Sequence, residues 1–126
     1  MRFATVREYT MSLPEVTEEP HHDYASFRVR GKIFAITGEG STRVSIKASL
    51  DDQAALVASD PGTFQPSAYT GRFGWITTDL TRVEPGLLED LLRSAWRRTA
   101  PRTAAKRPWE RSHRNGMSSR ARLWVE

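Results

Sequence analysis

The side chains best suited to metal chemistry lie in an acidic segment, where His21, His22 and Asp23 follow Glu18 and Glu19. Imidazole together with carboxylate suits zinc or iron. Adjacent histidines seldom bind one ion, however, and the spacings of known structural zinc sites are absent. An exposed polar connector explains the segment better, so we expect no metal and no other cofactor.

Motifs of nucleophilic or metal-dependent catalysis are missing from the chain. There is no cysteine, no G-x-S-x-G, no H-E-x-x-H and no glycine-rich phosphate loop after a predicted strand. We therefore expect binding rather than catalysis. The enzymatic alternative is a site built from distant residues, which leaves no linear signature.

Basic residues alternate with apolar ones along several predicted strands. Neighbouring strands lie about 4.8 Å apart and alternate residues about 6.6 Å apart, so side chains on the polar face can form one patch that matches a row of phosphates. The alternatives are a solvated face whose charges prevent edge-to-edge aggregation, or a protein interface. The candidate nucleic-acid-binding residues are Arg28, Arg30, Lys32, Arg43, Lys47 and Arg72.

Three aromatic residues lie close to Arg72 in the sequence. Trp75, Tyr69 and Phe73 would make a stacking platform for bases, and Trp75 is the one that we assign to the candidate site. The alternative is that these rings belong to the core, as aromatic residues in strands more often do.

The net charge of +4 comes from the C-terminal part of the chain. Residues 1–96 carry 10 Lys and Arg against 13 Asp and Glu, whereas residues 97–126 carry 9 against 2. Such an arginine-rich segment suits salt-sensitive contact with phosphates, and the alternative is an extension without a partner. Its candidate binding residues are Arg102, Lys106, Arg107 and Arg111.

The periodicity of apolar residues predicts three helices and five strands around one core. Helices are expected at 5–11, 51–59 and from Pro85 to about 98, where leucines recur at i, i+3, i+4 and i+7. Strands are expected near 27–30, 32–36, 43–47, 64–69 and 72–80, and a connector at 15–23. Pro66 restricts the fourth of these strands to the edge of a sheet.

These elements predict an α+β fold. We expect a two-layer sandwich in the order α-β-β-β-α-β-β-α, with an antiparallel sheet covered by helices. The predicted domain is 1–100, followed by a flexible basic tail at 101–126. The lack of cysteine fits a reducing compartment, and no window is apolar enough for a signal peptide or a membrane span, so we expect a cytoplasmic monomer or weak dimer.

Several segments in this order resemble the MmcQ/YjbR family. They are LPEVTEE at 13–19, FRVRGKIFA at 27–35, RVSIKA at 43–48, FQPSAYTGRFGWITTDL at 64–80 and the SAW of the last helix. The resemblance covers about residues 5–100. It implies a compact α+β sandwich related in shape to frataxin-like and secretion-chaperone-like folds, and DNA binding through hairpins that project basic side chains.

The leading hypothesis is therefore a non-catalytic protein that binds double-stranded DNA with little sequence specificity. The alternatives are a protein-interaction module resembling the secretion chaperones, and a binder of small ligands or metals with a frataxin-like shape.

Overall fold

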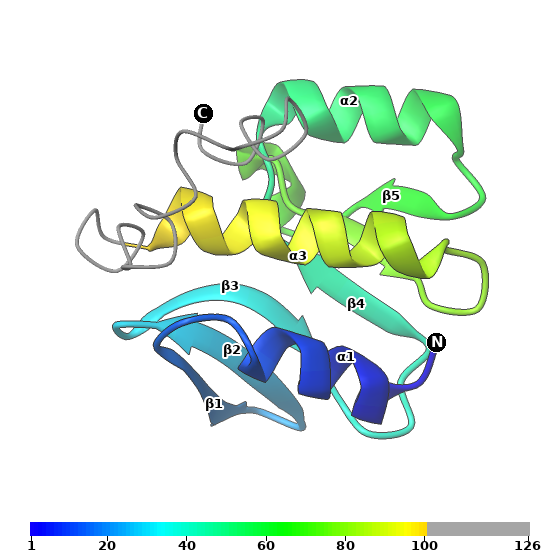
Figure 1. The fold of residues 1–126 in the computed structure, drawn as a ribbon. Helices are drawn as coiled ribbons and strands as arrows, with labels where there is room; N and C mark the ends of the chain where they lie inside the picture. Colours follow the sequence, from blue (N-terminus) through cyan, green and yellow to red (C-terminus); the bar gives the residue numbers. More distant parts are fainter. Residues whose placement is uncertain (101–126) are drawn as a thin grey trace, which may run out of the picture.

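A computed structural model describes residues 1–100, which form three α-helices, six strands and one turn of 3-10 helix (Figure 1). The candidate residues Arg102, Lys106, Arg107 and Arg111 lie outside the described residues. The elements in chain order are α1 (Phe3–Met11), β1 (Val16–His21), β2 (Tyr24–Val29), β3 (Lys32–Thr37), β4 (Arg43–Ile46), α2 (Leu50–Ser59), β5 (Phe64–Pro66), η1 (Thr70–Phe73), β6 (Ile76–Asp79) and α3 (Pro85–Thr99).

All six strands form one antiparallel sheet in the order β1-β2-β3-β4-β6-β5. The meander β2-β3-β4 follows the chain because its loops are too short for any other pairing. β6 then pairs with β4, and β5 occupies the edge, where the missing N–H of Pro66 leaves no gap in the ladder. The α+β class and the antiparallel sheet agree with the sequence prediction.

The hydrophobic core lies between the sheet and the helices α1 and α3, which Figure 1 shows on the same side of the sheet. Phe27, Ala35, Ile46 and Ile76 are cross-strand neighbours along four strands and are all buried. A β-bulge in the β2–β3 pairing places Phe34 beside Ala35, so both enter the core.

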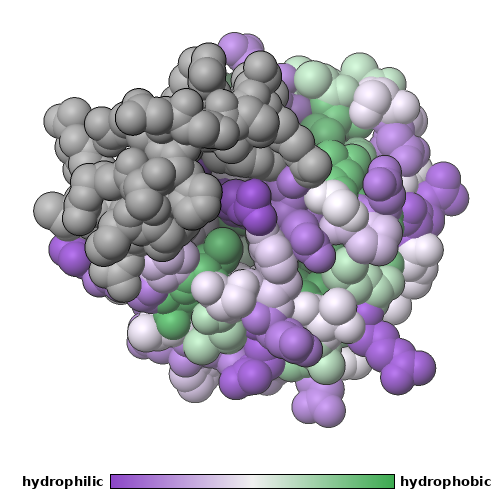
Figure 2. Space-filling view, in the orientation of Figure 1, coloured by the Kyte–Doolittle hydropathy of each residue, from purple (hydrophilic) through white to green (hydrophobic). Residues whose placement is uncertain are grey.

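Helix α3 supplies the largest buried side chain. Leu88, Leu92, Ala95 and Trp96 are buried along its predicted apolar stripe, and the indole N–H of Trp96 donates to the carbonyl of Pro14 at 2.8 Å. Each fully buried leucine contributes roughly 1.5–3 kcal/mol to stability. Figure 2 shows hydrophilic and hydrophobic residues intermixed on the visible face of the molecule.

The predicted connector at 15–23 is wrong, because the structure places strand β1 there. β1 lies at the edge of the sheet, so Pro20 is tolerated. Val16 pairs with the buried Val29, but Glu18, the next residue on the same face, is held by an ion pair with Arg7 instead of entering the core. The strand therefore lacks the alternation of apolar residues that would identify it.

The predicted strand at 72–80 is shorter in the structure. Residues 70–73 form η1, and the strand begins only at Ile76. The predicted alternation is nevertheless present, because Ile76, Thr78 and Leu80 are buried whereas Trp75 and Thr77 are only half-buried.

Candidate nucleic-acid interface

The face of the sheet opposite the core carries mainly short polar side chains. The pairing register places one row of neighbours across all six strands, namely Glu19, Ser26, Ile36, Ser45, Thr77 and Gln65. In the middle of this row Thr77 lies 2.9 Å, oxygen to oxygen, from Ser67 and 3.4 Å from Ser45. We call this surface the polar face.

Five of the six predicted cations of residues 1–100 lie at one end of the sheet, where β2 and β4 finish and β3 and β6 begin. Arg28 and Lys47 are on the polar face at this end, because each is one strand position removed from a core residue. Trp75 directly precedes β6 and is the next neighbour of Lys47 across the β4–β6 pair. We call this end, with the residues Arg28, Arg30, Lys32, Lys47, Arg72, Arg97 and Arg98, the basic end.

The cations of the basic end are not all equally available. Arg28 donates to the Ser26 hydroxyl at 2.9 Å and lies 3.8 Å from the Glu19 carboxylate. Arg30, in the β2–β3 turn, forms two hydrogen bonds with Glu15 at 3.0 and 3.3 Å. Charges paired in this way attract a polyanion less strongly.

Lys32 points to the other side of the sheet. It is the cross-strand partner of the buried Val29, and cross-strand partners share a face, so Lys32 lies at the margin of the helix side. The sequence analysis predicted one continuous patch on the polar face, but the six cations do not form one. Five of them surround one end of the sheet on both of its sides.

Arg43 lies at the opposite end of the polar face. It stands directly across from Asp79, whose pKa is lowered mainly by hydrogen bonds from the hydroxyl and backbone N–H of Thr81, and further by the charges of Arg43 and Arg82. Arg43 is thus separated from the other candidates by the length of a strand and balanced by a carboxylate.

The C-terminus of α3 adds Arg97 and Arg98 to the basic end. Arg98 lies 3.5 Å from the Asp52 carboxylate in the first turn of α2. Ser49, the residue directly before α2, packs on Gly74 beside η1. Figure 1 also shows the end of α3 on the same side as the β2–β3 turn and η1. The arginine-rich residues 101–126 follow directly from this end in the sequence.

Positive charge is therefore concentrated at one end of the described residues. Residues 1–100 contain twelve Lys and Arg against thirteen Asp and Glu. Seven of these cations are at the basic end, together with four carboxylates, so five cations face nine carboxylates elsewhere. The carboxylates of the basic end are Glu15, Glu19, Asp51 and Asp52.

Large aromatic side chains are exposed beside these cations. The side chain of Tyr69 is 93% exposed and that of Phe73 is 63% exposed, and the guanidinium carbon of Arg72 lies 4.8 Å from the centre of the Phe73 ring. Leu50, at the start of α2, is 56% exposed in the same corner. These rings are not core residues, which was the alternative in the sequence analysis.

The backbone of this corner is held firmly. Tyr69 has φ 62° and ψ −56°, and Thr70 N–H donates to the Ala68 carbonyl at 2.6 Å, which defines a strained γ-turn. The side-chain amide of Gln53 in α2 donates to the carbonyls of Gly71 and Trp75, both at 2.8 Å. No sequence motif predicted this turn or the role of Gln53.

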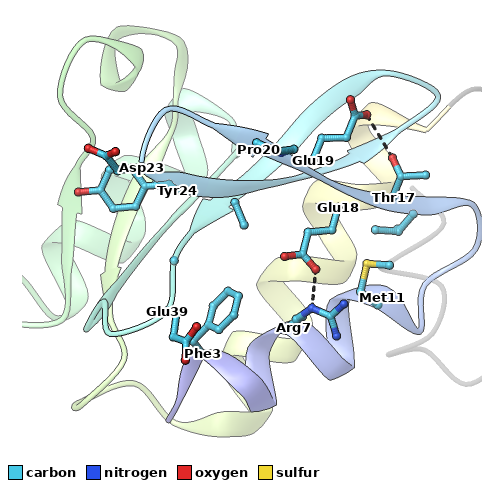
Figure 3. Close-up of a pocket in the computed structure, with 13 residues that line it drawn as sticks. Phe3, Arg7, Met11, Thr17, Glu18, Glu19, Pro20, Asp23, Tyr24 and Glu39 are labelled. Atoms are coloured by element: carbon cyan, nitrogen blue, oxygen red, sulfur yellow. Dashed lines mark hydrogen bonds and ion pairs between the residues drawn. The ribbon is translucent and has the colours of Figure 1, made fainter.

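A shallow groove lies between α1 and the β1–β2 hairpin (Figure 3). Its volume is about 610 Å³, and its lining includes the apolar side chains of Phe3 and Met11. Arg7 is the only cation among its lining residues and is bonded to Glu18. Because Glu19, Asp23 and Glu39 also line it, the groove is acidic and unsuited to a polyanion.

Residues 1–100 offer neither a cluster of metal ligands nor a membrane-spanning helix. No group of three or more His, Asp and Glu residues is arranged there to hold a metal ion. The histidines His21 and His22 contact each other edge to face at 4.9 Å in the β1–β2 turn. No helix of this part of the chain is long and apolar enough to cross a membrane.

Comparison with known proteins places this arrangement in a family. The family model described as YjbR matches residues 11–98, which is more than half of the chain. The chain belongs to the YjbR family. The match includes the strands, η1 and most of α3, so this YjbR domain carries both the polar face and the exposed aromatic corner.

A solved structure supports the YjbR fold independently. The chain is similar to the Deinococcus radiodurans protein DR2400, which carries the family-model domain DUF419, with a TM-score of 0.70 and 20% sequence identity. The alignment covers 98% of this chain and 87% of that chain. No curated protein matches the sequence.

Proposed function

We propose that this protein is a non-catalytic DNA-binding protein with little sequence specificity, and that it holds phosphates at the basic end. The observation that supports the proposal is the division of charge. Seven cations gather where β2 and β4 finish, and the arginine-rich residues 101–126 continue from the same end. Affinity of this kind rests on cations that neutralise phosphates and release counterions.

The cations best placed for this role are Lys47 and Arg72. Lys47 lies on the polar face beside Trp75. Arg72 is exposed on η1, with its guanidinium over the Phe73 ring. Arg28 and Arg30 contribute less, because each has a carboxylate as a neighbour. Arg43 is not part of this surface.

A salt titration of the full chain tests the proposal. Filter binding of a labelled duplex between about 50 and 200 mM salt should show a log affinity that falls linearly with log salt, with a slope near −0.9 for each phosphate contacted. A chain ending at Ala100 should bind more weakly and give a shallower slope. Affinity that does not change with salt would contradict the proposal.

A further inference from the structure

The exposed corner at η1 has features that phosphate binding alone does not require. Tyr69 and Phe73 present two aromatic rings to solvent, although burial of such rings is usually a major source of stability. Trp75 follows two residues after Phe73, and the β4–β6 register, which ends with Ile46 paired to Ile76, brings Lys47 and Trp75 to the end of the polar face. We call the surface of Tyr69, Arg72, Phe73 and Trp75 the aromatic corner.

The aromatic corner is preorganised. Gly74 has φ 105°, and a Cβ atom at this position would lie only 2.2 Å from the Ala48 carbonyl oxygen, so the chain passes closely over the start of α2. Together with the two hydrogen bonds from Gln53, this contact holds the loop against α2 and the residues that precede it. A rigid loop loses little conformational entropy when a ligand binds.

The strained γ-turn at Tyr69 supports a role in binding. Backbone conformations of this kind cost about 1–3 kcal/mol and tend to occur at functional sites. The hydroxyphenyl ring is almost fully exposed, so packing of the ring within the chain does not offset the cost. A ligand that contacts the ring would account for its presence.

We propose that the aromatic corner stacks on unpaired bases, so that the protein prefers single-stranded over double-stranded nucleic acid. The proposal rests on the proposed function and specifies the ligand. Rings that protrude from a cationic surface are the general means by which proteins bind single strands without reading sequence, whereas a duplex offers its base faces only at its ends. The nearby charges of Arg72 and Lys47 favour this ligand over an uncharged apolar partner.

The experiment compares an oligothymidylate of about 20 nucleotides with a duplex of the same length, by fluorescence anisotropy with the full chain. The variants are Tyr69→Ala, Phe73→Ala and the double variant, and Phe73→Leu keeps the apolar volume of the side chain without the ring. Tyr24→Ala is the matched control, because Tyr24 is also exposed, at 54%, but lines the acidic groove.

The wild-type chain should bind the single strand more tightly than the duplex. Each single change should weaken single-strand binding by about five- to a hundredfold and duplex binding by less than about threefold, and the control should change neither. The slope of affinity against salt should be the same in every variant, because no cation is removed.

Three results would overturn the stacking proposal. In the first, the wild-type protein binds, and the double variant loses affinity for both ligands equally or for neither. The proposed function then stands, but stacking does not. If the wild-type chain is a dimer in sedimentation and the double variant is a monomer, the corner is a contact between copies of this chain. If wild-type protein binds neither ligand at low salt, both proposals fail.

Discussion

Tyr69 combines a strained backbone with an exposed side chain. The strain lowers the stability of the fold, whereas the exposed ring is available to a ligand. Glycine adopts positive φ without steric cost, whereas tyrosine does not. The side chain makes few contacts that a substitution would remove, since the residue is 93% exposed. The strain at this residue therefore lowers the stability of the fold without a compensating contact in the free protein.

Replacement of Tyr69 by glycine is expected to stabilise the protein by about 1 kcal/mol, the strain released less the greater chain entropy of glycine in the unfolded state. Urea denaturation measures this difference. Tyr69→Ala is the matched control, because alanine keeps the strain and also lacks the ring. Both variants should lose single-strand affinity, but only the glycine variant should gain stability. A less stable glycine variant would show that the turn is not strained.

Asp79 is expected to influence stability at low pH. Its pKa in the folded chain lies below the ordinary value of 3.8, because Thr81 donates two hydrogen bonds to the carboxylate. The carboxylate therefore stabilises the fold above pH 3.8, and this contribution is lost as pH falls through the lower, folded-state pKa. Thermal unfolding of Asp79→Asn at several pH values should show a smaller loss of stability on acidification than the wild type. An identical pH profile would contradict the assignment.

At the scale of the elements, the loop from Ser67 to Trp75 is positioned by α2 rather than by the sheet alone. The close passage of Gly74 over Ala48 and the Gln53 amide link a ten-residue helix to η1. Residues of α2 are at most half-buried, so its position depends strongly on these contacts.

Gly74→Ala should therefore destabilise the protein by at least about 2 kcal/mol, because the added methyl group meets backbone rather than a movable side chain. Gly40→Ala serves as the control. Gly40 also has positive φ, but a Cβ there meets nothing within 4 Å, so it measures the cost of the conformation alone. Equal losses of stability in chemical denaturation would mean that α2 does not confine the loop.

The elements with a strong apolar pattern could be predicted from the sequence, and those held by tertiary contacts could not. The leucine stripe of α3 and the alternation of β6 have the periods of a helix and a strand. The start of α2 also has a local signature, a serine three residues before an acidic residue, and the Asp52 N–H donates to the Ser49 hydroxyl at 3.0 Å. β1 was missed because an edge strand with charged residues on both faces carries no period.

The candidate site was predicted in its residue types but not in its arrangement. Alternation along strands indicates which face a side chain takes, but it does not give the end of the sheet or the neighbouring carboxylates. Arg43 and Arg28 both lie on the polar face, yet one adjoins Asp79 and the other Glu19 at opposite ends. The γ-turn at Tyr69 depends on contacts with α2, which no local pattern contains.

At the scale of the whole molecule, the proposed binding depends on the location of charge rather than on its total. The described residues have nearly balanced charges, so a uniform distribution would give little attraction for a polyanion. Seven of the twelve cations instead lie at the basic end, whereas five cations and nine carboxylates lie elsewhere. Two variants with the same net charge, but with the changes at different ends, therefore distinguish binding at the basic end from attraction by net charge alone.

The most direct test is the affinity of the full chain for a single-stranded oligonucleotide after two matched pairs of charge reversals. Lys47→Glu with Arg72→Glu changes the basic end. Arg2→Glu with Arg82→Glu makes the same change in net charge at the opposite end, where Met1 contacts Leu80 and Arg82 lies near Asp79. At low salt the first pair should weaken binding by at least about tenfold and the second by less than about threefold. Equal losses from the two pairs would contradict binding at the basic end.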